Sequence, residues 1–125
     1  MYFVLCTSYP SLLKYEIRNT KYASEASFRL RSMSILTDPQ KAAFATSHPA
    51  WTLHEETITR TFTFEDFAEA IGFVTRVGVA AERVFHHPDI DIRWNTVTLT
   101  LTSHDVGGLT ERDVELAARI DSFVD

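Results

Sequence analysis

Three histidines are the side chains of this sequence best suited to proton transfer. His86 and His87 are adjacent, and His104 follows a stretch that reads as two short strands. Imidazole is the only side chain whose unperturbed pKa lies near neutrality, which suits general acid and base catalysis. With a tight turn at Asn95-Thr96, the register places His104 opposite His87. We therefore expect three imidazoles to converge on one small ligand.

Two neighbours of these histidines can orient the imidazoles. Pro88 limits His87 to extended backbone geometries and so helps to fix its direction. Glu82 precedes His86 by four residues, near the expected end of a helix. Its carboxylate can orient an imidazole or simply lie on a solvated turn.

Other polar and aromatic candidates have simpler structural explanations. Asp113 is explained more readily as a helix-capping carboxylate than as a catalyst. Trp51 and Trp94 are of a type more often found in the core than as a shelf for a ligand. His48 and His54 have no partner that the sequence identifies. Most histidines in proteins occupy surface or hydrogen-bonded sites. A purely structural role for these histidines is therefore the alternative to a catalytic role.

A zinc site is the main chemical alternative to acid and base catalysis. Three neutral imidazoles and an open coordination position suit a catalytic zinc ion. However, no H-x-x-x-H or H-x-E spacing occurs among His86, His87 and His104. We therefore expect neither a metal nor another cofactor.

Composition and charge narrow the class of protein. With 125 residues, 45% of them hydrophobic, the chain fits one globular domain. Residues 33–125 carry seven Lys or Arg against fifteen Asp or Glu, a net charge of −8 that would repel a phosphate backbone. No run approaches the roughly 20 apolar residues of a membrane span. Cys6 is the only cysteine, so no intramolecular disulfide can form, and we expect a soluble cytoplasmic protein without direct nucleic-acid binding.

The chain divides into an N-terminal segment and a domain with clear signals. Residues 1–32 match neither a helix nor a strand pattern, and we expect an extension of unknown role. The domain covers residues 33–125. Its first signal is a capping box, Thr37-Asp-Pro-Gln40, which predicts a short helix to about Thr46.

The remaining patterns alternate between hairpins and helices. Trp51 to Glu55 and Thr57 to Thr63 predict a hairpin around Glu56, and Thr63-x-x-Asp66 predicts the start of a long helix. Ile90 to Trp94 and Val97 to Thr102 predict a second hairpin, and Thr110-x-x-Asp113 predicts a last helix to about Phe123. The order α-β-β-α-β-β-α favours an α+β fold with an antiparallel sheet.

The long helix has more apolar surface than one sheet can cover. We expect its core stripe at Ile71, Val74, Val77, Ala81 and Val84, with Ala70, Phe73 and Val79 outside that stripe. Self-association through this helix is a reasonable hypothesis.

These residues together resemble a known family. Glu82-x-x-x-His86-His87-Pro88, followed by Trp94, His104 and Asp113 at their spacings, resembles the signature of the pterin-4a-carbinolamine dehydratases. The Trp51 segment and the stretch FTFEDFAEAIGFVTRVGVAAE resemble the hairpin and long helix of the same family. The similarity covers about residues 33–125.

The resemblance implies a fold, a reaction and roles for the site residues. The fold is a four-stranded antiparallel sheet with three helices on one face, assembled as a homodimer or homotetramer. The reaction is loss of water from 4a-hydroxytetrahydrobiopterin to give quinonoid dihydropterin, in support of an aromatic amino acid hydroxylase. His86 and His104 would be the acid and base near the 4a-hydroxyl, and His87 would bind the pterin and contribute to catalysis. Supporting or substrate-binding roles would fall to Glu82, Pro88, Trp51 and Asp113.

The resemblance also implies a second function. Some members of the family bind a homeodomain transcription factor and stabilise its dimer, through helical surface and without the histidines. An enzyme and a protein-binding module therefore share one expected fold.

Overall fold

The structure is a computed structural model that describes residues 34–125, so the expected extension over residues 1–32 lies outside the described residues. The elements are α3 (Asp38–Ser47), β1 (Thr52–Leu53), β2 (Ile58–Thr63), α4 (Phe67–Val84), β3 (Asp89–Arg93), β4 (Thr96–Leu101) and α5 (Glu111–Asp121). This order confirms the predicted α+β arrangement. No helix in the described part of the chain is long and apolar enough to cross a membrane.

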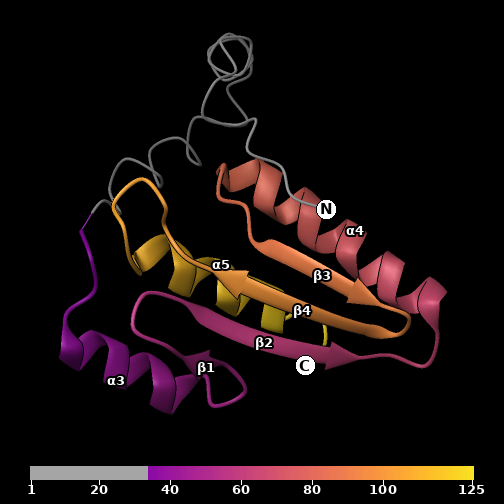
Figure 1. Cartoon of the computed structure of the whole chain (residues 1–125), viewed down its shortest axis with the longest axis horizontal. Helices are drawn as coiled ribbons and strands as arrows, with labels where there is room; N and C mark the ends of the chain where they lie inside the picture. Colours follow the sequence, from indigo (N-terminus) through magenta and orange to yellow (C-terminus); the bar gives the residue numbers. More distant parts are fainter. Residues whose placement is uncertain (1–33) are drawn as a thin grey trace, which may run out of the picture.

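The four strands form one antiparallel sheet in the order β1-β2-β4-β3 (Figure 1). Side chains on β2 and β4 alternate between the two faces, as the period of a strand requires. One face carries the core, and each helix of the described residues contributes to it, with Phe44 from α3, Phe73 from α4 and Leu116 from α5. The other face carries threonines whose hydroxyls pair across the strands, as in Thr61 with Thr98.

Two of the three described helices begin at the predicted N-cap residue, and the third begins three residues later. Thr37 with Gln40 and Thr110 with Asp113 both form complete capping boxes, as predicted. The predicted start of α4 at Thr63 is wrong by three residues, because Asp66 is the N-cap and its side chain accepts a hydrogen bond from the backbone N–H of Glu69.

The predicted register of the second hairpin is wrong. Arg93 pairs with Thr96, so the turn lies at Trp94-Asn95 instead of Asn95-Thr96. The reason is a contact with the connection between β2 and α4: the Asn95 carbonyl accepts from the backbone N–H of Phe64, and Asn95 Nδ2 donates to the Phe64 carbonyl. Trp94 takes the left-handed conformation at the turn, with φ of 51°.

The predicted core stripe of α4 is also displaced. The buried residues of the helix are Ala70, Phe73, Val77, Ala80, Ala81 and Val84. Ile71, expected inside, is 39% exposed, whereas Ala70 and Phe73, expected outside, are buried. Val79 lies outside the stripe as predicted, at 60% exposed. The helical period was readable, but the direction of its buried face depends on packing against α5 and β4.

Two further element bounds differ slightly from prediction. β1 contains only Thr52 and Leu53, because the chain leaves the sheet at His54 to form the connection to β2. α5 ends at Asp121, two residues before the predicted Phe123.

Candidate active site

A buried carboxylate connects His86 to the loop that carries His104. Asp113 Oδ1 accepts a hydrogen bond from His86 Nε2 at 2.6 Å, and Oδ2 accepts from Ser103 Oγ at 2.9 Å. The same Oδ2 accepts the backbone N–H of Thr110 at 2.9 Å, which is the capping contact predicted for Asp113. Asp113 is fully buried, and His86 is 6% exposed. With the carboxylate oxygen as the acceptor of this hydrogen bond, Nε2 of His86 is the donor and Nδ1 is left for other contacts.

The end of α4 determines where His86 and His87 lie. Phe85 caps the helix in the left-handed conformation, with φ of 52°, which reverses the chain direction. The backbone N–H of His86 still donates to the Ala81 carbonyl, so His86 stays attached to the last helical turn. Pro88 then leads into β3. The two histidines therefore sit on a tightly held junction between a helix and a strand.

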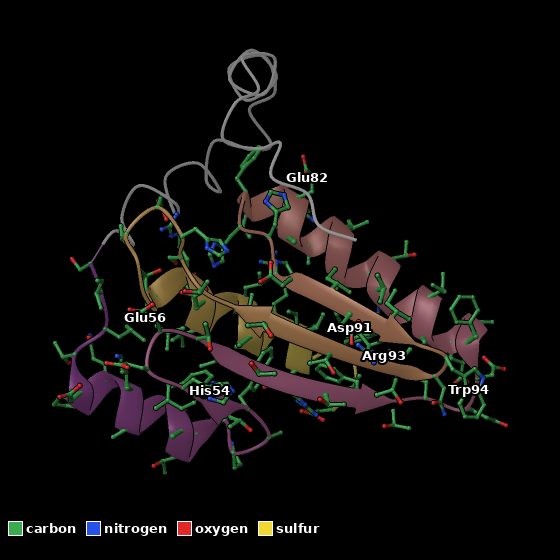
Figure 2. The ribbon with its side chains drawn as sticks, viewed as in Figure 1. His54, Glu56, Glu82, Asp91, Arg93 and Trp94 are labelled. Carbon is green, nitrogen blue, oxygen red and sulfur yellow. The ribbon has the colours of Figure 1, made fainter. Side chains whose placement is uncertain are left out.

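His87 pairs with Glu82 at the C-terminal end of α4. His87 Nε2 lies 2.8 Å from Glu82 Oε2, so the orienting role considered for this carboxylate is matched by the geometry. The two side chains are 25% and 59% exposed, respectively. Figure 2 shows Glu82 at this end of the helix, whereas Trp94 lies near the other end of the same helix. His86 and His87 thus each have a carboxylate partner, one buried and one open to solvent.

His104 lies in an exposed turn after β4. The predicted pairing with position 87 is wrong, since the β3–β4 ladder ends at Asp89 and Thr100. Within the described residues, no hydrogen bond or ion pair joins His104 to either of the other two imidazoles. The chain instead brings His104 to this region through Ser103, which shares the Asp113 carboxylate with His86. Convergence of the three rings on one ligand stays a prediction.

Arg112 and Asp105 form an ion pair that sequence reasoning missed. Arg112 Nη2 donates to Asp105 Oδ1 at 2.7 Å, and the Arg112 side chain is only 4% exposed. Burial alone would raise the pKa of the Asp105 carboxyl. The hydrogen bond and the charge of Arg112 outweigh it, so this pKa lies below its ordinary value of 3.8. His86 contributes a smaller attraction in the same direction. Only one sign of this pair is present in the sequence, namely that a charged residue, Arg112, lies inside the capping box formed by Thr110 and Asp113.

Metal binding was the alternative chemistry for the histidines. Within residues 34–125, no group of three or more His, Cys, Asp or Glu side chains is placed to hold a metal ion. The zinc alternative therefore lacks a donor set in this part of the chain.

The remaining candidates form a separate, structural cluster around Asp121. Trp51 is 3% exposed, and its Nε1 donates to Asp121 Oδ1 at 2.8 Å. Arg60 bonds the same oxygen, and His48 Nδ1 lies 3.1 Å from Oδ2, so His48 has a partner that the sequence did not identify. Trp51 is a core residue here, as its type suggested.

Two other residues, His54 and Trp94, lie on the surface. His54 is exposed beside β1, where Figure 2 labels it. Trp94 is 70% exposed, so the expectation that it belongs to the core is wrong, because the shifted turn turns it outward.

Comparison with known proteins adds the family context. A family model described as Pterin 4 alpha carbinolamine dehydratase matches residues 34–123, which include every described helix and strand. A relative from Nocardia farcinica (strain IFM 10152), provisionally named a pterin-4-alpha-carbinolamine dehydratase, is 53% identical over 89 residues, which is 71% of this chain and 94% of the relative. One from Chloroflexus aurantiacus (strain ATCC 29366 / DSM 635 / J-10-fl), named in the same provisional way, is 49% identical over 92 residues, covering 74% and 99%.

A solved structure is similar as well. The crystal structure of a transcriptional coactivator/pterin dehydratase from Brucella melitensis matches with a TM-score of 0.71 at 31% identity. The match covers 74% of this chain and 100% of that chain.

Proposed function

Because the chain belongs to the pterin 4 alpha carbinolamine dehydratase family, we propose that it removes water from 4a-hydroxytetrahydrobiopterin to give quinonoid dihydropterin. The observation that carries this proposal is that two consecutive imidazoles are each held by a carboxylate, at 2.6 Å and 2.8 Å. A dehydratase needs imidazoles held in fixed directions. The product would then return to the cofactor cycle of an aromatic amino acid hydroxylase.

The reaction requires two proton transfers and no external oxidant. The bond from C4a to the hydroxyl oxygen breaks, and an acid delivers a proton so that the oxygen leaves as water. A base removes the proton from the neighbouring ring nitrogen, and the electron pair of that N–H bond forms the new carbon–nitrogen double bond. Imidazole is a side chain that can serve as either the acid or the base in such a step.

Exposure changes which histidines we assign to these steps. The family resemblance gives the acid and base roles to His86 and His104. In the structure, however, His86 is nearly buried, whereas His87 is 25% exposed and His104 is exposed. We therefore assign proton exchange with the substrate to His87 and His104. His86, fixed by Asp113, would position the junction that carries His87.

The direct test is spectrophotometric dehydration of synthetic 4a-hydroxytetrahydropterin by purified protein. A general acid or base contributes about 100-fold to 10,000-fold, so His87→Ala and His104→Ala should each lower kcat by that range. His54→Ala is the matched control, because it removes an exposed imidazole beside β1 and should leave kcat unchanged. An inactive wild type would contradict the proposed reaction. Unchanged turnover in His87→Ala or His104→Ala would contradict that residue's assignment.

Self-association is part of the same proposal. α4 exposes Phe67, Ile71 and Val79, at 53%, 39% and 60%. Such apolar surface on one helix favours contact between copies of the chain. Sedimentation equilibrium at micromolar concentration should show a dimer or tetramer, and a monomer under these conditions would contradict it.

A second candidate function is binding of a protein partner in place of catalysis. The description of the Brucella melitensis structure as a transcriptional coactivator/pterin dehydratase favours it, and exposed apolar side chains on α4 supply a surface. A protein that is inactive on the carbinolamine yet binds a transcription factor tightly would support this function. Substitution of Val79 by Ser should then weaken that binding, whereas the histidine variants should not.

A further inference from the structure

The turn that carries His104 is anchored on its N-terminal side by a buried serine. Ser103 Oγ bonds to both Thr110 Oγ1, at 2.8 Å, and Asp113 Oδ2, at 2.9 Å, and Ser103 is 1% exposed. Its carbonyl accepts the backbone N–H of Gly107 at 3.0 Å, and its own N–H donates to the Gly108 carbonyl at 3.0 Å. The residue immediately before His104 therefore has a fixed position.

The residue immediately after His104 is anchored as well. Asp105 accepts the 2.7 Å hydrogen bond from Arg112, in the first turn of α5. The Arg112 Nε atom is buried and has no hydrogen-bond partner among the described residues. Part of the guanidinium is therefore without a hydrogen-bond partner in a buried position. Burying an arginine costs free energy that a partner must offset. A pKa of Asp105 below its ordinary value keeps the pair ionised at neutral pH.

We propose that the Arg112–Asp105 ion pair is a positioning device for His104: together with Ser103 it fixes the backbone on both sides of the imidazole. This inference rests on the proposed function, in which His104 exchanges a proton with the substrate. Arg112 and Asp105 act through His104 and are positioning residues. The first turn of α5 thus holds His86 through Asp113 and His104 through Arg112.

The geometry explains why one anchor would not suffice. Ser103 closes the base of the turn, because its carbonyl accepts the backbone N–H groups of Val106 and Gly107. These bonds do not hold the tip of the turn at His104 and Asp105, and His104 itself makes no bond to another described side chain. The Arg112–Asp105 pair ties this tip to α5. A displacement of about 1 Å at a proton-transfer group can cost roughly 100-fold in rate. Loss of the Asp105 anchor should therefore lower kcat and leave KM nearly unchanged, because the substrate still binds to the unaltered parts of the site.

The test uses variants of the full chain that separate anchoring from charge. Asp105→Ala removes the acceptor and should lower kcat about 10-fold to 100-fold. Asp105→Asn keeps an oxygen that accepts from Arg112 and should retain most of the activity. The double variant Asp105→Ala/Arg112→Met also removes the unpaired buried charge, so it should be well folded and still show the low kcat.

A matched control breaks a different ion pair between aspartate and arginine. Asp91 and Arg93 on β3 form a pair at 3.0 Å, with side chains 57% and 83% exposed (Figure 2). Asp91→Ala should leave kcat unchanged. Nitrogen-15 relaxation of the His104 backbone amide gives a readout that does not depend on activity. Its order parameter should fall in Asp105→Ala and in the double variant, but not in Asp105→Asn or Asp91→Ala.

The outcomes distinguish this inference from the proposed function. Full kcat in a folded Asp105→Ala variant overturns it, and so does a His104 amide that stays as rigid as in wild type. Wild-type protein without dehydratase activity defeats the proposed function, and the relaxation measurement then still decides whether the ion pair holds His104.

Discussion

The two pairs of histidine and carboxylate predict very different losses of stability for the same chemical change. Both have short contacts, 2.6 Å for His86 with Asp113 and 2.8 Å for His87 with Glu82. They differ in burial, because the Asp113 side chain is fully buried whereas that of Glu82 is 59% exposed. Asp113→Ala and Glu82→Ala are therefore a pair of variants that differ in the burial of the carboxylate and in the number of donors that it holds.

The magnitude for Asp113 follows from its three donors. His86, Ser103 and the backbone of Thr110 all bond to this carboxylate. A hydrogen bond to a charged group contributes about 1.5–3 kcal/mol, but members of one network do not add. A buried donor left without its acceptor costs about 1–3 kcal/mol, and Asp113→Ala leaves three such donors, so we expect a total loss of about 3–5 kcal/mol. Glu82→Ala should cost only about 0.2–1 kcal/mol, since solvent screens an exposed pair.

Urea unfolding followed by circular dichroism measures both values. Wild type and the two variants should show the same slope of the free energy against urea, so that the change in midpoint reports stability alone. Against a typical total of about 5–15 kcal/mol, Asp113→Ala should lose a large fraction. Equal losses in the two variants, or a loss below about 1 kcal/mol for Asp113→Ala, would refute the claim that burial makes Asp113 the main support of the site.

Three further predictions concern other parts of the fold. Asp121→Ala should lower stability by about 3–5 kcal/mol, measured by the same urea method, because it leaves Trp51, Arg60 and His48 without their shared acceptor; a loss near zero would contradict the cluster. Trp94→Phe should remove most of the acrylamide-quenchable fluorescence and leave the blue-shifted emission of Trp51, since these two tryptophans are 70% and 3% exposed; strong quenching of the remaining signal would count against this burial. The lowered pKa of Asp105 means that the unfolded state binds more protons in acid, so its stabilising effect is present at neutral pH and lost as the pH falls through its folded-state pKa. Between about pH 5 and pH 3, Asp105→Asn should lose less stability than wild type, and parallel pH profiles would disprove this contribution.

Features set by neighbouring residues were predictable from the sequence. The capping boxes at Thr37 and Thr110 need only a hydroxyl and an acceptor three residues later, so their pattern is complete in the sequence. The order of helices and strands follows from local periods in the same way. These signals yielded the fold class.

Features set by distant contacts were not predictable. The turn at Trp94-Asn95 is fixed by bonds to Phe64, which lies 31 residues away in the sequence. A shift of the turn by one residue changed the partner of every residue in the ladder and moved Trp94 to the surface. The contact between His86 and Asp113 spans 27 residues, and the capping role alone already explained Asp113. The residue types of the site were therefore readable, but their contacts were not.

One substitution separates the two roles that Asp113 performs. Glutamate is a usual third residue of a capping box, so Asp113→Glu should still cap the backbone of Thr110 and keep the helical circular dichroism signal of α5. The extra methylene has no free space in a fully buried site that already touches His86 at 2.6 Å. Overpacking of this kind costs about 1–3 kcal/mol, less than the loss expected for Asp113→Ala. The displaced carboxylate should also change the nitrogen-15 shifts of the His86 ring and lower kcat, because His86 is joined to His87 in the chain. Wild-type ring shifts and turnover in Asp113→Glu would mean that capping is the only task of this carboxylate.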